Sequence, residues 1–382
     1  MSYGYTEEQL MFKDMIADFM KKEVEPNKAR WDEEGYFPFD TYKKAFELGL
    51  HTMEIPEEWG GAGLDHETMA LIYEEAGYWD AGFGMTLLTS AVQPLKATVM
   101  YGTDAQIQMV SDVICNGGFG CWALTEADSG SDASSLSTSY RLEGNEYVIN
   151  GSKTFATLGA YADMYIVFAT RDKKLGKDGV SAFLVPGGLP GIVVGKSENK
   201  MGMRLSNTAT VSFDDVRIPV ENMLGPEGKG MKVALSTLNL GRFEIASLAN
   251  GITRRALEES VKYAKVRKSF GKPIIEHQMV MELLADMAAT LEAGRALVRE
   301  GMKAFEANDP NVRMMASAAK LICCDGCVKA SQDAIQVLGG YGYSKEYPVE
   351  KLYRDSKILQ ILEGTQQIQK IVIGRELTKR YG

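Results

Sequence analysis

The chain has 382 residues, 45% of them hydrophobic, and carries a formal net charge of −9 at pH 7. This length allows two or three domains with a substantial core. The acidic balance and the lack of a basic block argue against a general nucleic-acid-binding protein, because such proteins must neutralise a phosphate backbone.

The N-terminal stretch MSYGYTEEQLMF lacks the charged and apolar segments of a secretory signal, and no apolar run is long enough to span a bilayer. The 5 cysteines, an odd number in a chain of this size, do not resemble a secreted disulfide framework. We therefore expect a cytoplasmic protein with reduced thiols and no membrane partner.

Helical patterns dominate the first part of the chain, and we predict an N-terminal helical domain over residues 1–118. The first helix begins with TEEQ, in which the Thr6 hydroxyl can cap the helix while Gln9 completes a capping box. Further helices are predicted over 38–48, 67–77, 87–100 and 103–115.

After Gly117 and Gly118 the signal changes to short β-rich runs separated by turn residues. The runs are FGCWALT, EYVINGSKTF, MYIVFAT, VSAFLV and TATVSF. The stretch YRLEGNEYVI predicts a hairpin with its turn near Gly144. We predict a small central β domain over residues 119–227.

From Gly228 onward the helical period returns. Its clearest stripe alternates spacings of three and four residues and consists of Val280, Leu284, Met287, Leu291, Gly294, Val298, Met302 and Phe305. This stripe predicts a C-terminal four-helix-bundle domain over residues 228–382. The fold class is then α+β multidomain, with closely packed parts, since no long low-complexity linker separates them.

The motifs of several common site types are missing from the sequence. It contains no P-loop, no complete GxGxxG fingerprint and no GxSxG elbow, and its histidines do not pair at zinc spacing. Cys324 and Cys327 form a CxxC pair inside a helical pattern, without a second pair, so we interpret them as structural thiols. We expect no metal site.

Four stretches remain as candidate sites. LTEADSGSD (124–132) offers small and hydroxyl-bearing residues to a planar or anionic ligand. NGSKTFATLGAYAD (150–163) contains Phe155, which can cover a ring, and RKSFGKPI (267–274) offers a cation for a phosphate. Taken singly, these three can also be a plain loop, core packing and a solvated helix end. In the fourth, ILEGTQQIQ (361–369), Glu363 stands between large aliphatics and a Gly-Thr step.

Together with IPEEWGGAG, FDDVRIPVENMLG, GRFEIASLANGI and QVLGGYGYSKEYPVEKLYRD, these stretches resemble the acyl-CoA dehydrogenase family, on its bacterial short- and medium-chain-like branch. The number, order and spacing of the motifs carry the resemblance, which covers essentially the whole chain. It implies two helical domains around a β-barrel-like middle domain. It also implies FAD at a subunit interface of a homotetramer.

The resemblance gives Glu363 the role of catalytic base. It implies that Glu363 removes the α-proton of an acyl-CoA while the β-hydride passes to flavin N5, which produces a 2-enoyl-CoA. The neighbours Ile361 and Leu362 suit an apolar setting that raises the pKa of a carboxyl group. The alternative is an acidic residue that stabilises the dipole of the following helix.

Other roles follow from the resemblance, position by position. The expected FAD-binding residues are Leu124, Thr125, Ser131, Phe155, Thr157, Arg267, Phe270, Gln336, Gly340, Thr365 and Gln367, and the expected substrate-binding residues are Arg242, Leu362 and Ser131. Arg267 and Phe270 are expected to reach the FAD of another subunit. An electron-transferring flavoprotein is the expected electron acceptor.

Departures from the family pattern refine the prediction. Phe155 stands where many relatives have a tryptophan, and Leu362 stands where an aromatic residue usually precedes the base. The smaller Leu362 favours a wider acyl group, branched or alicyclic. Gly241 offers no alternative base, and Gly84 offers no cation for the distal carboxylate of glutaryl-CoA.

We therefore predict an FAD-dependent acyl-CoA dehydrogenase for a short or medium acyl-CoA. Three alternatives stay open. The enzyme can serve as an enoyl-CoA reductase that runs the reverse reaction, as an acyl-CoA oxidase, or as a non-catalytic flavin-binding scaffold.

Overall fold

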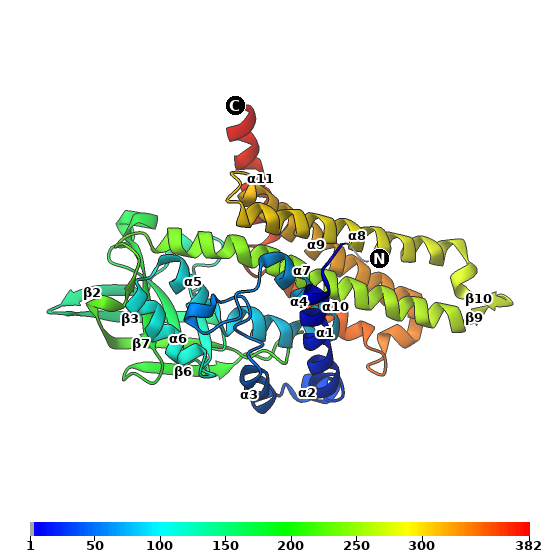
Figure 1. The fold of residues 1–382 in the computed structure, drawn as a ribbon, viewed down its shortest axis with the longest axis horizontal. Helices are drawn as coiled ribbons and strands as arrows, with labels where there is room; N and C mark the ends of the chain where they lie inside the picture. The colour runs from blue at the N-terminus through cyan, green and yellow to red at the C-terminus, as the bar shows by residue number, and fades with distance from the viewer. Residues whose placement is uncertain (1–3) are drawn as a thin grey trace.

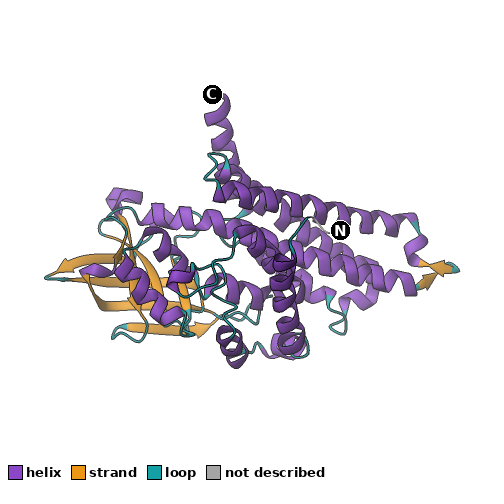
Figure 2. Cartoon of the chain, viewed as in Figure 1, coloured by secondary structure: helices purple, strands orange, loops and turns teal. Residues whose placement is uncertain are grey.

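The structure is a computed structural model that describes residues 4–382. An N-terminal helical part and a central β part precede a C-terminal helical part, which confirms the predicted fold class. The strands of the central part gather at one end of an otherwise helical, elongated molecule (Figure 2).

The N-terminal part agrees with most of the predicted helices. Its elements are α1 (Glu7–Phe19), the π-helical η1 (Met20–Val24), α2 (Lys28–Glu34), α3 (Phe39–Glu47), the 3-10 turn η2 (Glu57–Trp59), α4 (His66–Met85), the π-helical η3 (Thr86–Ser90), α5 (Gln93–Tyr101) and α6 (Asp104–Ile114). Thr6 and Gln9 form the predicted capping box of α1. The single helix predicted over 87–100 is wrong at its start, because η3 occupies Thr86–Ser90 and α5 begins only at Gln93.

The central part is one mixed sheet. Its strands are β1 (Gly120–Ala123), β2 (Ser139–Glu143), β3 (Glu146–Thr157), β4 (Met164–Thr170), β5 (Val180–Pro186), β6 (Ile192–Ser197), β7 (Thr208–Pro219) and β8 (Met223–Leu224), in the order β6-β7-β3-β2-β4-β5-β8 with β1 beside β4. β2 and β3 form the predicted hairpin. The Thr154 N–H donates to Thr125 O at 2.8 Å, so the end of β1 also meets β3 and the strands wrap around a core.

Strand β4 shows how the sheet joins the helices. All of its residues are buried. Because alternate side chains point to opposite faces of a strand, both faces of β4 must be covered. Tyr165 and Val167 belong to the core enclosed by the strands, whereas Ile166 and Phe168 pack with α5 and α6. The sheet therefore lies against the N-terminal helices on one face.

The C-terminal part consists of long helices. They are α7 (Gly230–Val266), α8 (Gln278–Glu306), α9 (Val312–Leu338), α10 (Val349–Leu359) and α11 (Gln366–Tyr381), with a short hairpin of β9 (Lys268–Ser269) and β10 (Lys272–Pro273) after α7. The predicted stripe lies on α8, and all of its members except Val280 and Phe305 are buried. Cys324 and Cys327 are buried in α9, as free thiols.

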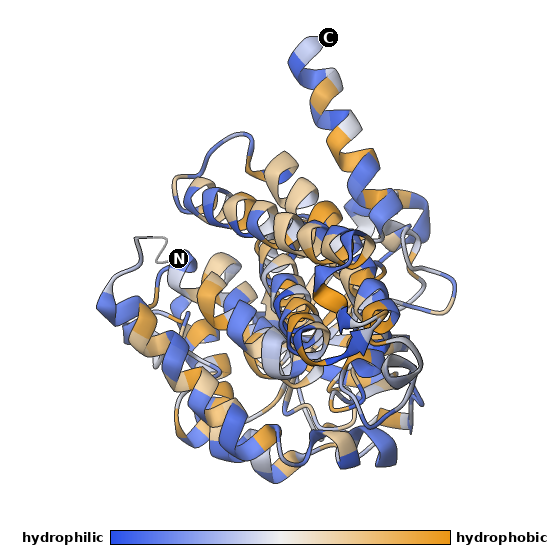
Figure 3. Ribbon diagram, turned by 90° about the vertical axis from the view of Figure 1, so that its right-hand side faces the viewer, coloured by the Kyte–Doolittle hydropathy of each residue, from blue (hydrophilic) through white to orange (hydrophobic). Residues whose placement is uncertain are grey.

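Helix α7 links the two ends of the molecule. It runs from the β part to the β9–β10 hairpin and packs against α4, α8 and α9 (Figure 1). Helix α11 stands clear of the body at its C-terminal end and carries hydrophobic residues there (Figure 3). Among residues 4–382, no helix combines the length and the apolar character needed to cross a bilayer.

Candidate active site

Glu363 lies in the loop between α10 and α11, not in a helix. Its φ is 52°, in the left-handed region, and that of Gly364 is 91°. Thr365 is the N-cap of α11, and its hydroxyl accepts a hydrogen bond from the Ile368 N–H at 3.3 Å. Glu363 therefore lies outside the first turn of α11, where an acidic residue would stabilise the helix dipole.

Two buried side chains hold this loop by its carbonyl oxygens. Lys320 Nζ, from α9, donates to Gly364 O at 2.8 Å, and the side chain of Lys320 is fully buried. Gln369 Nε2 donates to Gly364 O at 2.8 Å and to Glu363 O at 3.3 Å. Left-handed backbone at a non-glycine residue is strained, so such anchors keep Glu363 in place. The sequence analysis missed both residues, although a lysine inside the apolar helix pattern MMASAAKLICC signals a buried partner.

The Glu363 carboxylate points at α7. A Cβ atom at Gly241 would overlap Glu363 Oε2, so this glycine makes room for the carboxylate. The residue as a whole is partly exposed, but Oε2 is shielded from solvent and has no hydrogen-bond partner among residues 4–382. The expected shelter from its neighbours is only half present, because Leu362 packs on the core while Ile361 is 49% exposed.

Burial raises the pKa of Glu363 to about 8, and the negative charge of Glu244 adds to this effect. The cations Arg242, Lys320 and Lys96 act in the opposite direction. Since burial dominates, the carboxyl group is a stronger base than an ordinary glutamate. It can accept a proton near neutral pH.

Arg242 follows Gly241 on α7 and is buried. Its Nη1 donates to Asn239 Oδ1 at 3.0 Å and to Ser317 Oγ at 3.5 Å, while its buried Nε has no partner in the described chain. Burial lowers the pKa of Arg242 to about 10, so the group remains a cation at neutral pH. Buried polar atoms without partners are rare in proteins, and three of them lie here, on Arg242, Glu363 and Gln369.

A second group of predicted site residues lies on the sheet. Leu124 and Thr125 follow β1, and Phe155 and Thr157 lie on β3 beside them. A register shift of β3 between Lys153 and Ala156 includes Phe155, whose φ is 52° and whose side chain is 65% exposed. The bulge thus presents an aromatic ring to the outside. Ser131 is exposed in the loop that follows.

The bulge is anchored from within by a buried ion pair that the sequence analysis missed. Lys153 Nζ donates to Glu126 Oε1 at 2.7 Å and to Leu124 O at 3.2 Å, and the Lys153 side chain has no exposed surface. Lys153 therefore ties β3 to the loop after β1. The sequence signal was the alternation of β3, which places Lys153 on the inward face.

A third group lies at the far end of α7. Arg267 and Gly340 line one open cleft with a volume of about 620 Å³. Gln336, on α9, is exposed close to the cleft, and Phe270, at the turn of the β9–β10 hairpin, is 95% exposed with a φ of 49°. Thr365 and Gln367 start α11, apart from this cleft lining.

One chain does not bring all of these residues together. The sheet and the β9–β10 hairpin lie at opposite ends of the molecule (Figure 1), so the Phe155 group and the Arg267 group are separated along α7. Glu363 and Arg242 both lie next to Gly241, and the Arg242 cation acts on the Glu363 carboxyl group. The exposed aromatic rings and the arginine-lined cleft have the chemistry that a flavin ring and a pyrophosphate require.

Three regions of the sequence match known domain families. Residues 6–118 match the acyl-CoA dehydrogenase N-terminal domain, residues 121–216 the acyl-CoA dehydrogenase middle domain, and residues 228–378 the acyl-CoA dehydrogenase C-terminal domain. These matches cover most of the chain.

Whole proteins are similar too. The mitochondrial short-chain specific acyl-CoA dehydrogenase of Rattus norvegicus is 41% identical over 372 residues, which are 97% of this chain and 90% of the relative. The structure of butyryl-CoA dehydrogenase from Megasphaera elsdenii has a TM-score of 0.95 at 38% identity and covers 99% of this chain and 100% of its own.

A chain in a structure described as the electron transferring flavoprotein of Acidaminococcus fermentans has a TM-score of 0.94 at 40% identity, over 99% of both chains. Similarity of this extent, in sequence and in fold, establishes the family. The chain belongs to the acyl-CoA dehydrogenase family of FAD-dependent oxidoreductases.

Proposed function

We propose that this protein converts an acyl-CoA thioester to the 2-enoyl-CoA, with Glu363 as the base that removes the α-proton. The observation that carries the proposal is the shielded Oε2 of Glu363, which has no hydrogen-bond partner among the described residues. An α-proton next to a thioester is too weakly acidic for a solvated carboxylate. A desolvated carboxylate with a raised pKa is a better base for such a proton.

The backbone of Glu363 supports the same reaction. Within residues 4–382, its N–H makes no hydrogen bond, so it can donate to the thioester oxygen. Such a donor stabilises the negative charge that develops on this oxygen as the α-proton leaves. Arg242 adds a fixed positive charge whose field acts on the Glu363 carboxyl group.

The residues that would hold FAD lie on the sheet, at the far end of α7 and at the start of α11. Leu124, Thr125, Ser131, Phe155 and Thr157 would hold the flavin side, and Arg267, Phe270, Gln336, Gly340, Thr365 and Gln367 the nucleotide side, with contributions from two subunits. When bound, FAD supplies the acceptor for the hydrogen that leaves the β-carbon with its electron pair. Phe155 would cover one face of the ring system.

Assembly of several copies would join the two groups. Apolar side chains are exposed on α11, at the end of α7 and at the turn of the β9–β10 hairpin, namely Val266, Phe270, Ile371, Leu377 and Tyr381. Surfaces of this kind favour contact with a second copy. We infer a homotetramer, in the cytoplasm, that passes its electrons to an electron-transferring flavoprotein, a partner consistent with the similarity to the Acidaminococcus fermentans structure.

The substrate is proposed to be a short or medium acyl-CoA. Relatives named short-chain specific and butyryl-CoA dehydrogenases support a short acyl group. Leu362, smaller than an aromatic residue and only partly buried, leaves width for a branched or alicyclic group. The reverse reaction, reduction of an enoyl-CoA, would use the same Glu363 as the acid, since the two directions share one transition state.

The test is an anaerobic titration of the purified flavoprotein with a panel of acyl-CoA thioesters. Loss of the oxidised-flavin absorbance near about 450 nm would identify both the reaction and the preferred acyl group. Glu363→Gln should keep the flavin spectrum but bleach at least about 1,000-fold more slowly, because only the base is lost. The same substitution at the exposed Glu282 of α8 should change nothing. Normal turnover by Glu363→Gln would contradict the proposal.

A further inference from the structure

A cluster of buried charges lies on α7 one helical turn beyond Gly241. Residues three apart on a helix share a face, so Glu244 lies on the side of α7 that faces Glu363. Glu244 is 2% exposed. Its Oε1 accepts from Lys96 Nζ at 2.8 Å and its Oε2 from Thr89 Oγ1 at 2.9 Å.

The cluster continues away from the site. Lys96, on α5, also forms an ion pair with Glu54 and donates to the Tyr73 hydroxyl at 2.9 Å. Glu54 in turn lies 3.1 Å from Nδ1 of His66, at the start of α4. Lys96 thus has two carboxylate partners, of which Glu54 also pairs with His66.

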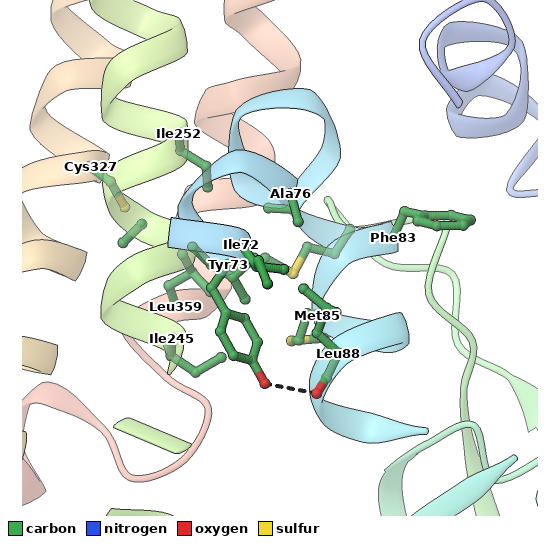
Figure 4. Close-up of a cluster of buried hydrophobic side chains, with 14 of the residues drawn as sticks. Ile72, Tyr73, Ala76, Phe83, Met85, Leu88, Ile245, Ile252, Cys327 and Leu359 are labelled. Atoms are coloured by element: carbon green, nitrogen blue, oxygen red, sulfur yellow. Dashed lines mark hydrogen bonds between the residues drawn. The ribbon is translucent and has the colours of Figure 1, made fainter. Parts of the chain in front are cut away.

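The surroundings of the cluster are apolar. Tyr73 reaches from α4 toward η3, where its hydroxyl donates to Leu88 O at 2.7 Å, and Ile245 lies in the same cluster of buried side chains (Figure 4). Removing charged groups from water is costly, and apolar side chains of similar size would pack here at no such cost. A second carboxylate beside Lys96 therefore calls for a functional reason.

The charges that act on Glu363 supply that reason. The cations Arg242 of α7, Lys320 of α9 and Lys96 of α5 lower the pKa of Glu363, whereas the negative charge of Glu244 raises it. Cations near a carboxylate make it a weaker base. Without an opposing charge, Lys320, which anchors the loop, and Arg242 would reduce the basicity of Glu363.

We propose that Glu244 is a positioning residue for the reaction: its carboxylate, one turn from Gly241, offsets the positive potential of Arg242 and Lys320 at Glu363. The inference rests on the proposed role of Glu363 as the base. Glu54 and His66 lie farther along the cluster and hold Lys96 in place. The substitution of a neutral residue for Glu244 should then weaken the base without removing it.

The test compares the pH dependence of kcat/KM for the holoenzyme, Glu244→Gln and Glu54→Gln, measured with the best substrate of the panel. Glu244→Gln should move the ascending limb of the profile, which reports deprotonation of the base, to lower pH by roughly half to one unit. Lys96 keeps Glu54 as its partner in this variant. Glu54→Gln removes the same charge from the same cluster but leaves Glu244, so it should move the limb much less.

Two further variants secure the interpretation. Glu244→Asp retains the charge and should restore the limb toward its original position. If Glu244→Gln does not fold, Glu244→Met, neutral and of similar length, replaces it with the same expected shift. An unmoved limb in the neutral variant, or equal shifts for positions 244 and 54, would overturn the inference.

The failure of this inference can be told apart from the failure of the proposed function. An inactive Glu363→Gln together with an unmoved limb in Glu244→Gln would overturn the role of Glu244 alone. An active Glu363→Gln would overturn both. The free energy of unfolding gives a readout that does not depend on turnover. The difference in this free energy between Glu363→Gln and the unsubstituted protein should grow with pH and become constant near the pKa of Glu363. When Glu244 is replaced by glutamine in both proteins, the difference should become constant at lower pH.

Discussion

The loop that carries Glu363 and the hairpin that carries Phe270 hold a strained backbone in different ways. Glu363, Phe155 and Phe270 all have positive φ values. The strained loop at Glu363 is anchored from inside the chain by Lys320 and Gln369. Phe270, by contrast, is 95% exposed at the tip of its hairpin. One chain thus holds Glu363 from within, whereas Phe270 lies on its surface.

We therefore expect the geometry at Glu363 and the affinity for FAD to depend on different parts of the molecule. The geometry of the base should respond to changes inside one chain and be indifferent to assembly. The affinity for FAD should respond to exposed residues at the two ends of the molecule and to protein concentration. Substitutions in each region can therefore show whether the two properties are independent.

The largest effect is expected at Gly241. In Gly241→Ala the new Cβ would collide with Glu363 Oε2 and displace the carboxylate. Displacement of a reacting group by about 1 Å can cost a factor of about 100, so kcat should fall by at least about 100-fold while FAD remains bound. Steady-state kinetics and the flavin spectrum measure the two. Gly374→Ala, where a Cβ meets no atom within 4 Å, is the control and should be nearly neutral. Loss of flavin from Gly241→Ala would contradict the expectation that the geometry at Glu363 and the affinity for FAD are independent.

Part of the fold could be predicted from the sequence, and part of it could not. The order of helices and strands, the capping box at Thr6 and the α8 stripe were predictable, because local periodicity and caps determine them. The π-helical segment η3 was not, since its wide turn depends on tertiary contacts.

Within the site, Glu363 and Gly241 could be recognised from motifs in the sequence. The buried partners Lys320, Gln369 and Glu244 could not, because each acts through residues far away in the chain. Sequence patterns indicate which residues are buried, but long-range contacts decide what they face. The separation of Phe155 from Arg267 likewise needed the three-dimensional arrangement of α7.

A smaller effect is expected at Arg267. Loss of a charge-assisted hydrogen bond to a phosphate in Arg267→Ala should raise the Kd of FAD by about 10- to 100-fold. Turnover per bound flavin should change little, because Glu363 lies elsewhere. Release of flavin fluorescence on dilution gives the Kd. The neighbouring exposed Lys268 provides the matched control as Lys268→Ala. Equal losses in both variants would mean that only the overall positive charge matters.

The last prediction is a stability difference that reports how well the Glu363 carboxyl group is buried. An unfolded chain ionises Glu363 at its ordinary pKa of 4.5, whereas the folded chain holds the proton up to a pKa of about 8. Between these values the unfolded state binds fewer protons, so this group lowers the free energy of unfolding by about 1.4 kcal/mol for each pH unit as pH rises. Glu363→Gln cannot titrate and should escape this loss.

The gain in stability of Glu363→Gln over the unsubstituted protein should therefore grow from about pH 5 to about pH 8 and stay constant above, as thermal unfolding of the holoenzyme without substrate can measure. Glu143 of β2 is the control, because its pKa is shifted in the opposite direction from that of Glu363. Its exposed carboxyl group binds Arg141 and Arg217, which lower its pKa. It is thus ionised in both states over this range, and Glu143→Gln should show no growing gain. If the stability difference between Glu363→Gln and the unsubstituted protein also stays constant with pH, water reaches the Glu363 carboxylate. Glu363 would then titrate like an exposed glutamate.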